Sequence, residues 1–158
     1  MNGKREGPLG KTKEKQMLAC LAEPQKFALA GKAVFTIVSK ATGARFTYRV
    51  KLAPPRYCWK NKDPVHFVSV LTGADNMSSY TYLGTIRSGA FTHGKKSRIG
   101  EDAPSAKAFA WFWRHLMTGD ALASLNVHHE GKCGRCGRAL TVPSSIASGF
   151  GPECINLV

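Results

Sequence analysis

Three cysteines near the C-terminal end of the chain have the spacing of a metal site. Two residues separate Cys133 from Cys136, so both thiolates can turn toward one ion, and Cys154 follows a loop rich in glycine and proline. Structural zinc takes four ligands, usually cysteine and histidine. We therefore expect a zinc ion held by His129, Cys133, Cys136 and Cys154. His129 is preferred to His128 because three residues separate it from Cys133, enough for the chain to double back.

Other uses of these cysteines fit the surrounding sequence less well. A redox pair stands at the start of a helix in a strand–helix–strand unit, whereas Cys136 is followed by Gly-Arg-Ala-Leu-Thr-Val-Pro. A disulfide needs an oxidising compartment, and the sequence shows no recognisable signal peptide. Catalytic zinc needs an open coordination position with an acid or base nearby, and the acidic neighbours Glu130 and Glu153 each adjoin a predicted ligand in the chain. We expect a structural zinc ion.

The cysteine segment also carries a recurring pattern. It reads Cys-Gly-Arg-Cys-Gly-Arg-Ala-Leu-Thr from Cys133, then Pro-Ser-Ser, then Gly-Phe-Gly-Pro-Glu-Cys up to Cys154. This pattern resembles a short zinc-knuckle domain of unknown function that is common in phage, prophage and actinobacterial proteins. The upstream part, including residues 30–32, 42–49 and 111–115, is similar to small uncharacterised proteins of phages and mobile elements that end in the same knuckle. The resemblance implies a phage-like origin and no established activity.

The chain is strongly basic. Its 158 residues include 23 Lys and Arg against 10 Asp and Glu, which gives a formal net charge of +13 at pH 7. Such an excess indicates a polyanionic partner, and DNA or RNA is the leading candidate. We expect a small zinc-containing protein that binds nucleic acid mainly through phosphate contacts. The alternative is a phage-encoded inhibitor that binds a host protein, such as a defence or nucleic-acid-handling factor.

The composition and the absence of certain motifs argue against a membrane protein and against an enzyme. The chain is 43% hydrophobic and 9% aromatic, as in folded domains, and no stretch approaches the roughly 20 apolar residues of a membrane span. Nucleotide-binding glycine loops and Ser-His-Asp, Cys-His or paired-carboxylate arrangements are absent, so we expect no enzyme. Cys20 and Cys58 are expected to be inert thiols in a reducing bacterial cytoplasm. The predicted parts are a flexible basic tail (1–16), an α+β domain (17–125) and a zinc knuckle (126–158).

Alternating residues predict two β-hairpins. Residues 33–39 and 45–52 are rich in β-branched and aromatic side chains around a turn, and residues 65–71 and 80–86 repeat this arrangement. Phe109, Phe112, Trp113 and Leu116 recur at helical spacing and predict one helix packed on the sheet. The expected fold class is therefore α+β, with a mainly antiparallel four-stranded sheet, one helix and a C-terminal zinc knuckle. One face of such a sheet stays open.

Cations and aromatic rings provide the candidate nucleic-acid contacts. Residues 45–52 place a cationic row on the face opposite their apolar side chains, because successive side chains of a strand point oppositely. Aromatic side chains that alternate with cationic ones in the sequence suit stacking on nucleic-acid bases. Residues 87–100 are predicted to form a basic loop without acidic residues. Each group also fits an ordinary solvated surface or a cap on the sheet edge. The predicted contacts are Arg45, Arg49, Lys51, Tyr57, Trp59, Tyr82, Arg87, Lys95, Lys96, Arg98, Arg135 and Arg138.

Overall fold

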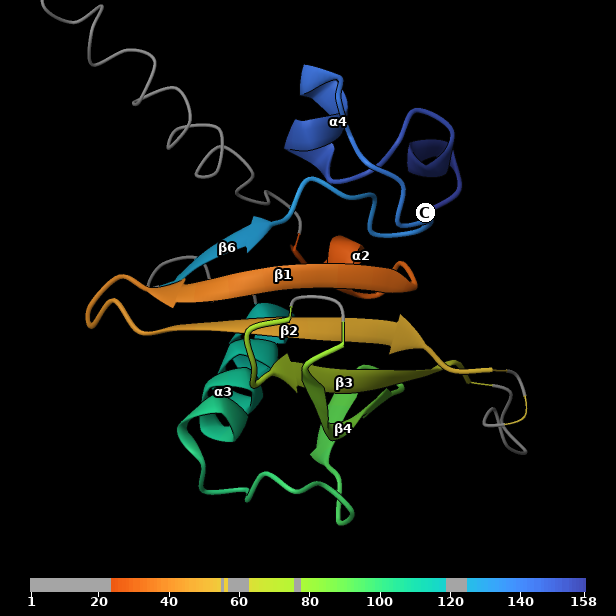
Figure 1. The fold of residues 1–158 in the computed structure, drawn as a ribbon. Helices are drawn as coiled ribbons and strands as arrows, with labels where there is room; N and C mark the ends of the chain where they lie inside the picture. Colours follow the sequence, from red (N-terminus) through yellow and green to blue (C-terminus); the bar gives the residue numbers. More distant parts are fainter. Residues whose placement is uncertain (1–23, 55, 57–62, 76–77, 119–124) are drawn as a thin grey trace, which may run out of the picture.

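A computed structural model describes residues 24–54, 56, 63–75, 78–118 and 125–158. The predicted basic tail, Cys20, Cys58, Tyr57 and Trp59 lie outside these residues. The described strands form one antiparallel six-stranded sheet in the order β5-β4-β3-β2-β1-β6 (Figure 1). The elements are α2 (Pro24–Ala28), β1 (Lys32–Ser39), β2 (Arg45–Leu52), β3 (Val65–Leu71), β4 (Tyr80–Arg87), β5 (Ala90–His93), α3 (Pro104–Thr118), β6 (Leu125–His129), α4 (Pro143–Ser148) and the 3-10 helix η3 (Cys154–Asn156).

The α+β class is confirmed, but the predicted number of strands is wrong. The sheet has six strands instead of four, because β5 lies within the predicted basic loop and β6 within the predicted linker and knuckle. Ser88 and Gly89 join β4 to β5 with φ angles of 51° and 79°, the left-handed backbone that tight two-residue hairpins require. In β6 the side chains of Leu125, Val127 and His129 are buried in alternation. Both strands are short, and pairing with a longer neighbour stabilises them.

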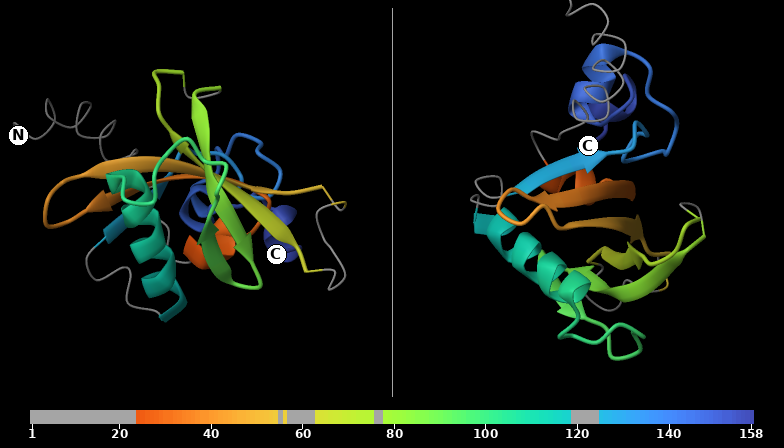
Figure 2. Two further views of the ribbon diagram at one scale, coloured as in Figure 1. Left: turned by 90° about the horizontal axis from the view of Figure 1, so that it is seen from below. Right: turned by 60° about the vertical axis from the view of Figure 1, so that its left-hand side comes forward.

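One face of the sheet is covered by helices α2 and α3, which lie behind the sheet in the view of Figure 1 and on one side of it in Figure 2. The predicted helical stripe is confirmed, since Phe109, Phe112, Trp113 and Leu116 are all buried. Two hydrogen bonds fasten α3 to the strands. Tyr48 Oη donates to the Ser105 carbonyl at 2.6 Å, and Trp113 Nε1 donates to the Gly89 carbonyl at 2.9 Å.

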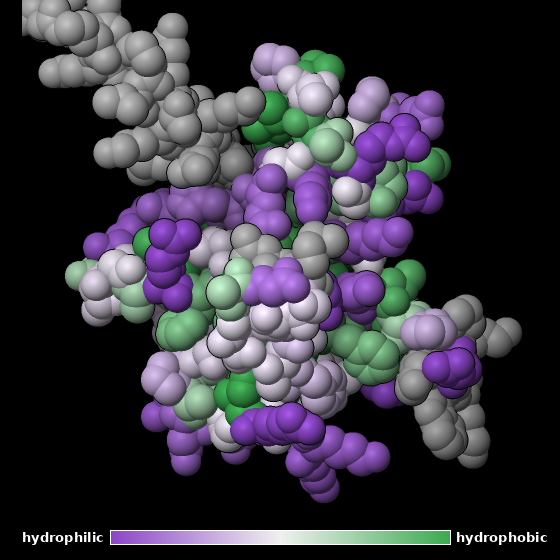
Figure 3. Space-filling view, viewed as in Figure 1, coloured by the Kyte–Doolittle hydropathy of each residue, from purple (hydrophilic) through white to green (hydrophobic). Residues whose placement is uncertain are grey.

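The opposite face of the sheet carries no described helix. In β2, Tyr48 and Val50 point into the core, whereas Arg45 and Lys51 are exposed and Arg49 is half-buried. Figure 3 shows hydrophilic and weakly polar residues over most of this side of the molecule, with hydrophobic ones in small separate groups. We call this surface the open face. None of the described helices is long and apolar enough to span a membrane.

Gly84 allows β4 to approach β5 closely. The pairing of β3 with β4 shifts its register between Val68 and Ser69, opposite this glycine, as in a β-bulge. A Cβ atom at Gly84 would collide with the carbonyl oxygen of Thr92. The sequence predicts a bulge or a close backbone approach here, and both are present.

Candidate metal centre and nucleic-acid interface

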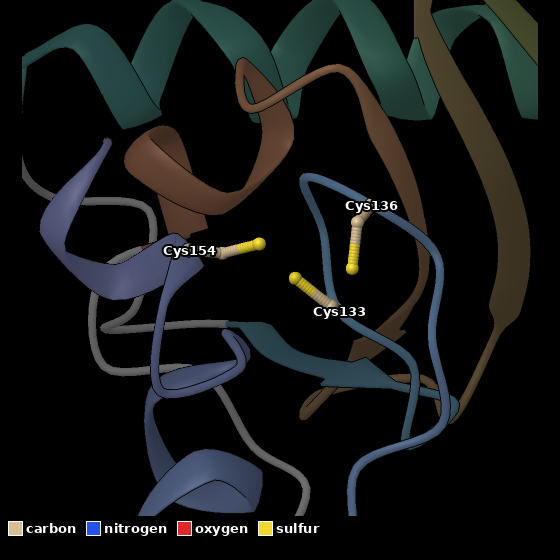
Figure 4. A group of neighbouring side chains, drawn as sticks. All are labelled: Cys133, Cys136 and Cys154. Atoms are coloured by element: carbon tan, nitrogen blue, oxygen red, sulfur yellow. The ribbon is translucent and has the colours of Figure 1, made fainter.

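The structure brings together the three predicted cysteines. The Sγ atoms of Cys133, Cys136 and Cys154 all lie within 4.8 Å of one another and point toward a common centre (Figure 4). Four sulfurs at the usual 2.3 Å from a tetrahedral zinc ion stand about 3.8 Å apart. The three thiols are not joined in a disulfide. Their number, chemistry and spacing therefore fit a thiolate-binding metal ion such as zinc.

Two glycines shape the loop that carries the first two cysteines. Gly137 adopts a φ angle of 80°, which costs a residue with a side chain more than it costs glycine. Gly134 lies directly against the Phe27 ring, where an added Cβ would stand 2.7 Å from ring carbons. The Cys133 amide donates to the Arg138 carbonyl at 2.8 Å and closes the turn. The Cys-Gly-Arg-Cys-Gly sequence thus meets two separate steric demands.

Backbone amides point at the Cys133 sulfur. The amides of Arg135 and Gly151 donate to it at 3.4 Å and 3.5 Å. Burial by itself raises the pKa of the Cys133 thiol, but the amides of Cys136, Gly151 and Arg135 and the Cys154 thiol together lower it to about 7. The loop therefore stabilises a thiolate, the form that binds metal.

His129, the predicted fourth ligand, is not part of this group among the described residues. It is buried, and both of its ring nitrogens are used: Nδ1 accepts the Gly131 amide at 2.9 Å and Nε2 donates to the Ile146 carbonyl at 2.6 Å. Burial lowers its pKa, although the Ile146 carbonyl partly opposes this effect. The ring is therefore a neutral bridge between β6 and α4.

We expect His129→Ala to keep its bound metal and to lose stability. The substitution removes the partner of the half-buried Ile146 carbonyl and Gly131 amide, and the loss of each such hydrogen bond costs roughly 0.5–1.5 kcal/mol. Metal content measured by mass spectrometry should stay at the wild-type ratio in the folded fraction, while the melting temperature falls. A folded variant without metal would restore His129 as a ligand.

The loop between β6 and α4, residues 130–142, which we call the metal loop, is attached to the sheet. Its chain leaves β6, which pairs with β1, and the Lys32 amide at the start of β1 donates to the Gly134 carbonyl at 2.7 Å. The Phe27 ring of α2 contacts Phe150 and His129, with centroids 5.8 Å and 5.6 Å apart. The predicted knuckle therefore shares a hydrophobic cluster with the α+β domain.

A second site is a hollow on the open face, which we call the face pocket. Its volume is about 520 Å³, and none of its described lining residues is acidic. The lining residues are Arg49, Lys51, Leu52, Pro54, Phe67, Ser69 and Tyr82. Three of these, Arg49, Lys51 and Tyr82, are predicted nucleic-acid contacts that the fold places side by side. Phe67 and Ser69 were missed, although the alternation of residues 65–71 puts both on the face opposite Val68 and Val70.

The Arg49 guanidinium is fixed by an aromatic ring. Its central carbon lies 4.3 Å from the centroid of the Tyr80 ring, a cation–π geometry. Burial raises the pKa of Tyr80, Glu130 raises it further, and Arg49 lowers it. Glu130 and Arg49 thus act on the Tyr80 hydroxyl with opposite charges.

The predicted basic loop is anchored beside the face pocket. Ser97 Oγ donates to the Tyr82 carbonyl at 2.6 Å, and the Gly94 amide donates to the Leu83 carbonyl at 2.9 Å. Lys95 and Lys96 are exposed on this anchored turn. Hydrogen bonds to β4 therefore hold the cations of this loop next to Tyr82.

The remaining predicted contacts lie at other places on the surface. Arg45, Arg87, Arg98 and Arg138 are exposed and do not line the face pocket. Arg135 is exposed on the metal loop, and its Nη1 lies 3.7 Å from the Cys154 sulfur.

The metal loop and the face pocket adjoin each other at Gly31. A Cβ atom placed on this glycine would stand 3.8 Å from the Arg135 carbonyl oxygen and 3.9 Å from the Leu52 Cβ. The Leu52 amide also donates to the Gly31 carbonyl at 3.0 Å. Gly31 therefore lies between the backbone of the metal loop and Leu52, which lines the face pocket.

Comparison with known proteins bears on the C-terminal part alone. No curated protein and no solved structure matches the chain. Residues 124–155, which include β6 and all three clustered cysteines, match the model of a family described as "Family of unknown function (DUF6011)".

Proposed function

We propose that this chain is a non-catalytic, zinc-containing nucleic-acid-binding protein that holds phosphates with the cations of its open face. The observation that carries this proposal is the face pocket, where Arg49 and Lys51 stand beside the rings of Phe67 and Tyr82 without a described acidic neighbour in the lining. Cations that track phosphates and rings that meet bases are the two components of nucleic-acid grooves. The net charge of +13 adds long-range attraction to any polyanion.

Zinc has a structural role in this proposal. Cys133, Cys136 and Cys154 would hold the ion, which would close the loop that carries the exposed Arg135. A guanidinium on a fixed loop loses less conformational entropy when it binds a phosphate. Bound zinc would supply a rigid crosslink between the metal loop and η3.

The cellular compartment and the origin of the protein are part of the same proposal. The free thiols of Cys133, Cys136 and Cys154 suit a reducing compartment such as the bacterial cytoplasm. The cysteine pattern resembles knuckles of phage and mobile-element proteins, which favours such an origin.

The test is direct binding of the zinc-loaded protein to labelled single- and double-stranded DNA and RNA, followed by fluorescence anisotropy over a range of salt concentrations. If Arg45, Arg49, Lys51, Lys95 and Lys96 each contact a phosphate, log affinity should fall against log salt with a slope of roughly 3.5–4.5. Dissociation constants weaker than about 0.1 mM for every nucleic acid at about 50 mM salt would contradict the proposal. The same charged surface would then be assigned to an acidic host protein.

A further inference from the structure

We infer that the face pocket receives one unpaired base of a single-stranded nucleic acid, with the neighbouring phosphates on Arg49 and Lys51. This inference rests on the proposed function and specifies its ligand. A duplex buries the faces of its bases in the helical stack, whereas a single strand can turn a base outward onto an aromatic side chain. The pocket volume of about 520 Å³ falls within the roughly 300–1,000 Å³ of small-ligand sites.

Two rings form the aromatic part of the pocket. The centroids of Phe67 and Tyr82 lie 6.2 Å apart with an interplanar angle of 83°. Because the rings are almost perpendicular, a flat base that stacks on one ring stands perpendicular to the other and can turn its edge toward that ring's face. Such edge-to-face contacts are favourable for aromatic groups.

The Tyr82 ring is held in place before any ligand binds. It lies against the backbone of Gly94, where an added Cβ would stand 2.5–2.8 Å from ring atoms. The Tyr82 carbonyl also accepts the hydroxyl of Ser97 at 2.6 Å. A ring fixed in this way loses little entropy when a base stacks on it.

Charged and polar groups surround the rings on the same face. Arg49 pairs with Ser69 across β2 and β3, and Ser69 pairs with Tyr82 across β3 and β4. A cation, a hydroxyl and a ring therefore follow one another across three strands. Lys51 pairs with Phe67 in the adjacent row. These two rows place phosphate-binding and base-binding groups next to each other, which a single nucleotide requires.

Phe67→Leu tests the stacking contact, and Trp111→Leu is its matched control. Both substitutions replace a half-buried aromatic residue with leucine, but Trp111 lies on α3 and stacks on His115 at 3.9 Å, away from the face pocket. Probes are an oligothymidylate and an oligouridylate of about 12 nucleotides, within the usual site size, and a DNA duplex of equal length. Ser69→Phe provides a second variant, because it fills the pocket without removing a ring.

The wild-type protein is expected to bind the single strands more tightly than the duplex. Phe67→Leu and Ser69→Phe should each weaken single-strand binding by roughly 5- to 150-fold, leave duplex binding and the salt slope unchanged, and keep a cooperative melting transition. Trp111→Leu should bind like the wild type. The thymidylate and uridylate probes distinguish DNA from RNA.

Duplex binding that equals or exceeds single-strand binding, or unchanged affinity in both pocket variants, would overturn this inference and leave the proposed function intact. Absence of binding to all three probes would overturn both.

Discussion

Cys133→Ser is expected to lose its bound metal and to destabilise the sheet as well as the metal loop. The binding free energy of structural zinc in finger peptides is about 10–16 kcal/mol, which is as large as the total stability of an ordinary domain, about 5–15 kcal/mol. Without the ion, the loop should open and Phe27 should lose its contacts with Phe150 and His129. A loss of about 3 kcal/mol, the size of a large-to-small core substitution, lowers the melting temperature by roughly 6–12 °C.

Metal content and thermal unfolding followed by circular dichroism measure this effect. The control is the double variant Cys20→Ser/Cys58→Ser, which removes two thiols that are predicted to be spectators and should keep both the metal and the melting temperature. A chelator should reproduce the effect of Cys133→Ser on the wild-type protein. Wild-type protein without metal, or Cys133→Ser with an unchanged melting temperature, would contradict a structural metal site.

Arg49→Ala/Lys51→Ala is expected to lower the salt slope of nucleic-acid binding by about two units. Each phosphate contact releases condensed counterions, and removing one contact reduces the slope by about one. Both side chains line the face pocket, so the double variant should lose two phosphate contacts with the same segment of bound nucleic acid. The affinity should fall for all sequences alike, because phosphates carry no sequence information.

A matched control exists on the other side of the sheet. Lys107 and Arg114 are exposed on α3, which covers the face opposite the pocket. Lys107→Ala/Arg114→Ala also removes one lysine and one arginine, so it lowers the net charge by the same amount as Arg49→Ala/Lys51→Ala. A general effect of net charge would therefore appear in both double variants, whereas loss of specific contacts appears in one.

Features that depend on neighbouring residues in the chain were predictable from the sequence. The helical spacing of Phe109, Phe112, Trp113 and Leu116 has one solution, in which a single face of a helix is buried. The alternation in β2 likewise determines which side chains share a face. The short connection between Cys133 and Cys136 brings their sulfurs together by local turn geometry.

Features that depend on distant pairing were not predictable. The pattern Leu125, Val127, His129 is compatible with a strand, but its pairing with β1 joins residues as distant in the chain as Phe35 and His129. The role of His129 also depends on a distant residue, because the Ile146 carbonyl that accepts its hydrogen bond comes from α4. Phe67 joins Arg49 and Tyr82 in one pocket through the register of three strands, which no local pattern specifies.

The central claim is that the open face binds nucleic acid, and the difference in salt slope between the two double variants tests it most directly. Anisotropy titrations with one labelled oligonucleotide over several salt concentrations give both slopes. We predict that Arg49→Ala/Lys51→Ala lowers the wild-type slope by about two units and that Lys107→Ala/Arg114→Ala leaves it unchanged. Equal slopes in the two variants would show that binding reflects net charge alone and would contradict the assignment of the open face.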